Sequence, residues 1–196
     1  MPAPANPSVA NAGDDAVHLV VDPRISRFQV QAFAAGLLSP FGHNPVIAIR
    51  DFEAEIYYRP QQVEGSRLSL RIDPHNLEVA SEVSDKDRRE IEQTMRQDVL
   101  EVDRYPEIRY DCSRISARVT GEGQYSVVLN GDLTLHGVTR GHSIPARAYG
   151  NGNGLRASGE FTVRQSDYSI RLVSVGGVLR VKDELKFSFD LMARPG

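Results

Sequence analysis

The sequence has a single cysteine, Cys112, among its 196 residues. It therefore cannot form a disulfide within the chain, which is consistent with a reducing compartment. In that setting a lone cysteine usually serves as a small buried hydrophobic side chain. We interpret Cys112 in this way and assign it no redox or metal chemistry.

Long hydrophobic runs and targeting features are also missing. No stretch approaches the ~18 consecutive apolar residues that a membrane-spanning helix needs, so we expect no integral membrane segment. The first fifteen residues are rich in Pro, Ala and Asn and lack the basic start and apolar centre of a secretory signal. We interpret residues 1–15 as a disordered tail and 16–196 as one domain. The expected location is the cytoplasm, or the periplasm if a leader has been removed.

Charge of one sign is not concentrated anywhere. There are 23 Lys and Arg against 26 Asp and Glu, a net charge of −3, and the arginines are spread singly along the sequence. A nucleic-acid-binding protein normally carries a clustered basic patch. The distribution therefore predicts no nucleic-acid partner.

Catalytic signatures are absent as well. A nucleophile elbow reads Gly-x-Ser-x-Gly, whereas Val173–Gly177 lacks the first glycine. There is no phosphate loop and no dinucleotide fingerprint. His136 and His142 do not have a recognised metal-ligand spacing, and the position of His136 in the strand pattern predicts a solvated side chain. The sequence thus predicts no enzyme, no cofactor and no metal site.

What the sequence has in abundance is alternation with a period of two. From Tyr125 to His136 the odd-numbered residues are apolar, and the even-numbered residues are polar except for Val128. We call these two alternating sets the two parities of the strand. Successive side chains of a strand point to opposite faces, so this segment should bury one face. Asn130-Gly131 is an ordinary hairpin signal, but the alternation continues through it. We therefore predict an unbroken strand with Gly131 at a close approach of two backbones.

The same alternation recurs along the chain, interrupted by short turns. The apolar parity changes near Arg50–Asp51 and again after Cys112, and one inserted residue at each place would explain the change, so we predict two β-bulges. About eight to ten strands linked in sequence predict an all-β fold with one main helix. A closed, extended up-and-down antiparallel barrel is favoured, because closure removes exposed edges.

The helix is expected between Ser84 and Leu100. Ser84 is a suitable N-cap, and acidic residues follow it in the first turn. Ile91, Met95 and Val99 form a narrow apolar stripe, which predicts a helix packed on the outside of the body. Glu92 and Arg96 are spaced to form an ion pair.

The inward-facing residues of the strands form an apolar set that no charge interrupts. An eight-stranded barrel can be filled by its own side chains or can hold one small ligand, and the pattern leaves both alternatives open. The candidate ligand-binding residues on the strands are Phe28, Val30, Phe52, Ile56, Tyr58, Leu68, Leu70, Ile108, Tyr110, Val127, Leu129, Leu133, Phe161, Phe187 and Phe189.

One loop adds two further candidates. Ser39–Pro45 contains two prolines and a glycine and carries Phe41 and His43. A neutral imidazole in a stiff loop could bind the polar end of a ligand, alone or together with Tyr58 or Tyr110, or it could hydrogen-bond backbone groups of the loop itself. Acid–base chemistry at His43 would need a partner that the sequence does not identify.

Three segments carry a resemblance to a known family. The block Gly131–Arg140 (GDLTLHGVTR) resembles the signature of the YceI-like family, the bacterial polyisoprenoid-binding proteins. Tyr105–Tyr110 (YPEIRY) and Asp22–Phe28 (DPRISRF) are similar to segments at corresponding places in that family, and the helix with Asp87-Arg88 lies where the family has its main helix. The resemblance extends roughly from Val17 to Leu191.

The resemblance implies a lipocalin-like barrel that holds an isoprenoid chain in an apolar tunnel. The expected function is then to bind, sequester or transport a long apolar ligand, a polyprenyl quinone or another isoprenoid or fatty-acyl lipid. Two alternatives remain: an enzyme that acts on a lipid-like substrate with His43 as acid or base, and a ligand-free interaction module. An isologous homodimer is the oligomer to expect, because two-fold dimers are the commonest.

Overall fold

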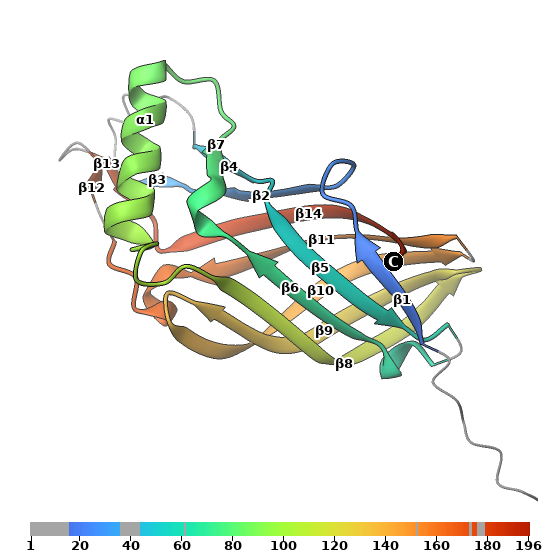
Figure 1. The fold of residues 1–196 in the computed structure, drawn as a ribbon. Coiled ribbons are helices and arrows are strands. Elements are labelled where there is room, and N and C mark those ends of the chain that lie inside the picture. The colour runs from blue at the N-terminus through green and yellow to red at the C-terminus, as the bar shows by residue number, and fades with distance from the viewer. Residues whose placement is uncertain (1–15, 36–43, 61, 152, 173, 176–178) are drawn as a thin grey trace, which may run out of the picture.

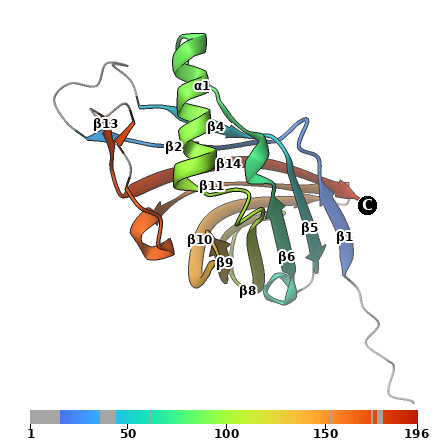
Figure 2. The same ribbon diagram turned by 60° about the vertical axis from the view of Figure 1, so that its left-hand side comes forward.

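The protein folds into an elongated β-barrel with one helix standing across an end (Figures 1 and 2). The computed structural model describes residues 16–35, 44–60, 62–151, 153–172, 174–175 and 179–196. The strands are β1 (Val17–Val21), β2 (Arg27–Gln31), β3 (Ala34–Ala35), β4 (Val46–Ile49), β5 (Phe52–Tyr58), β6 (Arg67–Ile72), β7 (Leu77–Val79), β8 (Ile108–Gly121), β9 (Gln124–Leu135), β10 (Val138–Asn151), β11 (Gly154–Arg164), β12 (Ser174–Val175), β13 (Leu179–Val181) and β14 (Glu184–Pro195). The helical elements are α1 (Asp85–Thr94), the π-helical turn η3 (Met95–Val99) that continues it, and the short 3-10 turns η1 (Val63–Gly65), η2 (Pro74–Asn76) and η4 (Gln165–Tyr168).

Eight strands close the barrel, and all neighbours are antiparallel. The order is β1-β5-β6-β8-β9-β10-β11-β14, and β14 pairs back onto β1 through registers such as Leu19↔Pro195. The other half of β14 pairs with β2, and from there β4 and β7 extend the sheet toward the helix. The predicted all-β, closed antiparallel barrel with one main helix is therefore confirmed.

The predicted bulge at Arg50–Asp51 is wrong, although the parity change that suggested it is real. The chain leaves the ladder there, so that β4 ends at Ile49 and β5 begins at Phe52. The adjacent strand breaks at the same level, because Ile49 pairs with Leu77 in β7 whereas Phe52 pairs with Ile72 in β6. The Asn76 side-chain amide donates to the Asp51 carboxylate at 2.6 Å and links the two breaks. A bend shared by neighbouring strands, and not one inserted residue, changes the parity.

The second predicted bulge is confirmed. Pairing between β8 and β9 shifts register between Cys112 and Arg114. The strand through Asn130-Gly131 is unbroken, and Gly131 does mark a close approach. A Cβ at Gly131 would lie 2.4 Å from the Asp111 carbonyl oxygen and 2.9 Å from Cζ of Tyr110. The ring of Tyr110 therefore occupies the space that a side chain at residue 131 would need.

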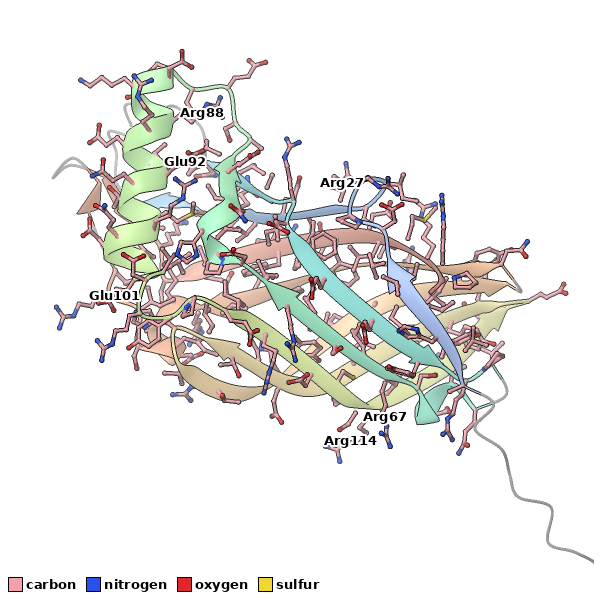
Figure 3. All side chains as sticks on the ribbon, in the orientation of Figure 1. Arg27, Arg67, Arg88, Glu92, Glu101 and Arg114 are labelled. Atoms are coloured by element: carbon pink, nitrogen blue, oxygen red, sulfur yellow. The ribbon has the colours of Figure 1, made fainter. Side chains whose placement is uncertain are left out.

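The helix α1 begins at the predicted N-cap, where the Ser84 hydroxyl accepts a hydrogen bond from the Asp87 backbone N–H at 3.1 Å. The predicted Glu92–Arg96 ion pair is present at 3.4 Å. Both side chains also reach β7, the last strand of the sheet order: Glu92 accepts from the Val79 N–H, and Arg96 donates to the Leu77 carbonyl, each at 3.0 Å. Figure 3 shows Glu92 between the helix and this strand.

The helix therefore covers the edge of β7 whose backbone groups have no neighbouring strand among the described residues. An uncovered edge strand presents unpaired backbone groups that invite pairing with another chain. No helix within the described ranges has the length and apolar character needed to cross a membrane.

Candidate functional site: an apolar cavity in the barrel

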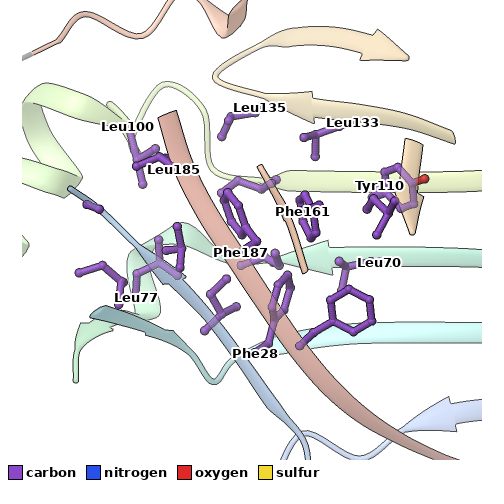
Figure 4. Close-up of a pocket in the computed structure, with 18 of the residues that line it drawn as sticks. Phe28, Leu70, Leu77, Leu100, Tyr110, Leu133, Leu135, Phe161, Leu185 and Phe187 are labelled. Atoms are coloured by element: carbon purple, nitrogen blue, oxygen red, sulfur yellow. The ribbon is translucent and has the colours of Figure 1, made fainter. Parts of the chain in front are cut away.

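The inward faces of the strands and of the helix enclose a cavity of about 240 Å³ (Figure 4). This lies just below the ~300–1,000 Å³ of typical ligand pockets. Among the described residues of its wall, the polar ones are Ser81, Thr94, Arg109 and Gln165, apart from the hydroxyl of Tyr110. The remaining wall is aliphatic or aromatic. Such a surface favours hydrocarbon over water or a charged ligand.

Most of the residues expected to bind ligand do line this cavity. The twelve that lie on its wall are Phe28, Val30, Ile56, Leu68, Leu70, Ile108, Tyr110, Leu129, Leu133, Phe161, Phe187 and Phe189. Their contact with a ligand remains a prediction. The period-two pattern predicted the inward direction of these side chains, which come from strands of the barrel and from β2 beside it.

Three other candidates lie elsewhere in the core. Phe52, Tyr58 and Val127 are buried, but their side chains pack against neighbours and do not form part of the cavity wall. Facing inward is therefore not the same as facing the lumen. Phe41 and His43 lie outside the described residues, so the expected role of His43 at the polar end of the ligand stays a prediction.

Four phenylalanines on the described part of the wall, Phe28, Phe161, Phe187 and Phe189, contact one another. The rings of Phe161 and Phe187 stack at 4.8 Å with an interplanar angle of 9°. Phe28 packs edge-on against Phe189 at 6.4 Å and against Phe52 at 5.9 Å. These mutual contacts hold the rings in place, so the cavity has a wall of fixed shape.

The helix contributes to the cavity, which the sequence did not reveal. Ile91, Met95 and Val99, the predicted packing stripe, all lie on the wall, together with Leu100. The stripe does pack on the barrel, as expected, but over its end, where it closes the lumen. The spacing of the stripe was visible in the sequence, whereas the end of the barrel that it covers was not.

The polar groups of the wall mostly have partners already. The Tyr110 hydroxyl donates to the carbonyls of Leu129 at 2.9 Å and His142 at 3.0 Å. Gln165 donates its side-chain amide to the Lys182 carbonyl at 2.9 Å, and Arg109 forms an ion pair with Asp111 at 2.7 Å. Burial raises the pKa of Tyr110 well above its ordinary value, so the phenol stays neutral. Its single proton is committed to backbone carbonyls, and Tyr110 is therefore a poor donor for a ligand.

His142 is a half-buried residue, and one of its ring nitrogens has no such commitment among the described residues. It lies on β10 with the same parity as the buried Ile144 and Ala146. Its Nε2 is buried and has no hydrogen-bond partner among the described residues, and burial lowers the pKa of the ring. The ring meets Phe161 edge-on at 5.5 Å. Nothing in the sequence predicted this environment, because the spacing of His136 and His142 bears only on metal binding.

His136 is not the solvated residue that its parity predicted. Its side chain is only 9% exposed, and Nε2 lies 2.8 Å from Oε2 of Glu101. The ring packs on Tyr105 with 4.3 Å between centroids. The expectation was wrong because His136 adopts a positive φ of 51° in the β9–β10 turn, where the strand's alternation no longer sets the direction of the side chain.

A family model described as the YceI-like domain matches residues 20–193. The chain belongs to the YceI-like family. Curated relatives include UPF0312 proteins of Pseudomonas putida and Pseudomonas savastanoi, each 26% identical over 160 residues and covering 78% of this chain and 78% of their own.

Solved structures share the fold of this YceI-like chain. BcnA of Burkholderia cenocepacia matches with a TM-score of 0.68 and 19% identity, covering 88% of this chain and 98% of its own. A polyisoprenoid binding domain from Saccharophagus degradans matches with a TM-score of 0.68 and 12% identity, covering 92% and 99%. A YceI protein of Campylobacter jejuni matches with a TM-score of 0.61 and 15% identity, covering 84% and 91%.

Among the described residues, no group of three or more His, Cys, Asp or Glu side chains could hold a metal ion. The site that the structure does present is the apolar cavity, with His142 and the β10–β11 wall beside it.

Proposed function

We propose that this protein binds a long apolar molecule, a polyisoprenoid or fatty-acyl lipid, inside its barrel, and sequesters or transports it without changing it chemically. The observation that carries the proposal is the cavity itself, closed by α1 at one end and walled by aliphatic and aromatic side chains. A barrel that needed only stability would be expected to fill this space with its own side chains.

The binding energy would come from burial. Each methylene removed from water contributes about 0.8 kcal/mol, so a tail of a few isoprene units supplies affinity with few polar contacts. The stacked rings of Phe161 and Phe187 would present a flat surface to the planar double bonds of an isoprenoid. The Saccharophagus degradans neighbour, a polyisoprenoid binding domain, supports the isoprenoid class as the first to test.

Native mass spectrometry tests the proposal. Protein purified from bacterial cells should carry extra mass that organic extraction releases as a lipid, and the emptied protein should take up a polyprenyl quinone. A wild-type protein found only at its bare chain mass, with no uptake, would overturn the proposal.

A pair of variants locates the bound lipid. Ala157 lies on the cavity wall, so Ala157→Phe adds a ring to the lumen. Ala48 lies on β4 between the buried Ile47 and Ile49 and so faces the other side of its strand, where Ala48→Phe adds the same ring outside the cavity. We expect Ala157→Phe to reduce lipid uptake at least tenfold and Ala48→Phe to leave it unchanged. Circular dichroism of both variants should match the wild type; equal uptake by both would argue against binding in the lumen.

A further inference from the structure

The strands β10 and β11 are paired along only part of their length. Their register runs from Arg147↔Ser158 to Asn151↔Gly154. Among the described residues, the part of β10 before Arg147 pairs only with β9, as far as Val138. The part of β11 after Ser158 likewise pairs only with β14, as far as Arg164. Pro145 lies where the ladder stops, and a proline has no backbone N–H to continue it. The barrel wall therefore opens between the two strands.

A polar cleft occupies this opening. Arg140 and His142 line it from β10, Thr162 and Arg164 from β11, and Tyr168 from the turn that follows. Its described walls also carry Asp167 and Glu184. Two positive and two negative charges balance, so the cleft as a whole does not select for an anion.

His142 stands between this cleft and the apolar cavity. It pairs across the strands with Gly131, beside the buried ring of Tyr110. On its other side its ring contacts Phe161, which lies on the cavity wall and is labelled with Tyr110 in Figure 4. A molecule with its tail in the cavity could therefore bring a polar end to this imidazole.

The imidazole has an unused hydrogen-bonding capacity. Leaving a buried polar group without a partner is costly, and such a group in a folded protein calls for an explanation. Burial lowers the pKa of His142, so its ring is neutral near pH 7 and offers one donor and one acceptor nitrogen. A neutral ring suits an uncharged oxygen, either a carbonyl that accepts or a hydroxyl that donates.

The other orphaned nitrogens found among the described residues have different surroundings. Nε2 of His18 lies 3.7 Å from the Glu55 carboxylate on a side chain that is 39% exposed. Nε of Arg96 belongs to a guanidinium that already donates to Leu77. His142 is the one of the three that meets the lining of the cavity.

We propose that His142 hydrogen-bonds the uncharged oxygen of the ligand's head group, a quinone carbonyl or the hydroxyl of a polyprenyl alcohol, at the inner end of the cleft between β10 and β11. This assignment rests on the proposed lipid-binding function. It gives the ligand a direction, with the tail among the phenylalanines and the head at the β10–β11 opening.

Three lipids test the assignment on delipidated full-length protein. Squalene is an isoprenoid hydrocarbon without oxygen, a polyprenyl alcohol of matched carbon number adds one hydroxyl, and its phosphate adds charge. Dissociation constants are measured for the wild type, His142→Phe and His142→Gln. His18→Phe is the matched control, since it makes the same change at a histidine away from the cavity.

We expect His142→Phe to bind the alcohol about tenfold more weakly, the usual effect of one hydrogen bond, and to bind squalene as well as the wild type does. His142→Gln should bind the alcohol more tightly than His142→Phe but less tightly than the wild type. His18→Phe should bind all three lipids as the wild type does. A merely structural role for His142 would weaken both lipids together.

Four results would overturn the assignment. Unchanged alcohol binding in His142→Phe, or equal losses for alcohol and squalene, would show that His142 does not bind the head group. The proposed lipid binding itself would still stand. If the protein binds the phosphate more tightly than the alcohol, and His142→Phe does so too, then the arginines of the cleft and not His142 bind the head group. Failure of the wild type to bind any of the three would reject the proposed function as well.

Discussion

Nε2 of His136 lies 2.8 Å from Oε2 of Glu101, and this contact joins the segment after the helix to the β9–β10 turn. Both residues have positive φ, 51° and 45°, so each turn presents its side chain to the other. The second ring nitrogen of His136 lies 3.3 Å from the Tyr168 carbonyl oxygen, and Tyr105 packs on the ring. One imidazole thus connects the helix end, the hairpin and η4 around the end of the cavity.

The pair should show energetic coupling in a double-mutant cycle. Asn tolerates positive φ, so His136→Asn removes the ring without adding backbone strain, and Glu101→Gln removes the charge. We expect Glu101→Gln to destabilise the wild type and to have little effect in the His136→Asn background, a coupling of about 1 kcal/mol in urea unfolding. Additive effects of the two substitutions would show that the contact contributes nothing to stability.

Alternation was enough to predict the barrel and most of its lining. It assigned the faces of β9 correctly, and it kept the strand continuous through Gly131 because the phase did not change there. It failed where side-chain direction is set by something else. At His136 a left-handed backbone turns the ring inward, and at Arg50–Asp51 a bend across neighbouring strands changes the phase.

The lumen itself could not be predicted from a period of two. Phe52 and Phe161 have the same inward parity, yet Phe161 lines the cavity and Phe52 does not. The difference depends on the curvature of the sheet and on which residues oppose each other across the barrel. The sequence pattern of a single strand carries information on neither. The same holds for His142, whose importance comes from the parting of β10 and β11.

Gly131 should be intolerant of any side chain. A Cβ there would lie 2.4 Å from the Asp111 carbonyl oxygen and 2.9 Å from Cα of Cys112, so the backbone of β8 would have to move. We expect Gly131→Ala to lower the free energy of unfolding by about 3 kcal/mol or more. At Gly141, which lies across the ladder from Asp132, the nearest atom would be 4.0 Å away, and Gly141→Ala should change stability by no more than about 0.5 kcal/mol. Similar losses at both positions in urea unfolding would contradict the steric argument.

Alkaline pH should weaken the fold partly through Tyr58. Burial, with a hydrogen bond to Tyr125, raises the pKa of Tyr58 to about 12, against about 10 in an unfolded chain. The folded state therefore favours the neutral phenol, and this stabilisation is complete below pH 10 and is lost as the pH rises toward 12. We expect Tyr58→Phe to flatten the fall in unfolding free energy over this range. The same change at Tyr57, which is 46% exposed, should not; an unaltered slope in Tyr58→Phe would refute the assignment.

The contacts between α1 and β7 should control how fast a lipid leaves. The helix closes one end of the cavity, and Glu92 and Arg96 fasten it to the edge strand through Val79 and Leu77, while Arg88 donates to the Val79 carbonyl as well. If lipid passes at this end, Glu92→Ala should release the edge N–H and speed the dissociation of a bound polyprenyl quinone about tenfold, measured by transfer to acceptor vesicles. Gln93→Ala is the control, because Gln93 is exposed on the same helix and its amide contacts only Gln97 among the described residues. Equal rates in both variants would mean that lipid does not pass under the helix, and the β10–β11 opening would then be the place to constrain next.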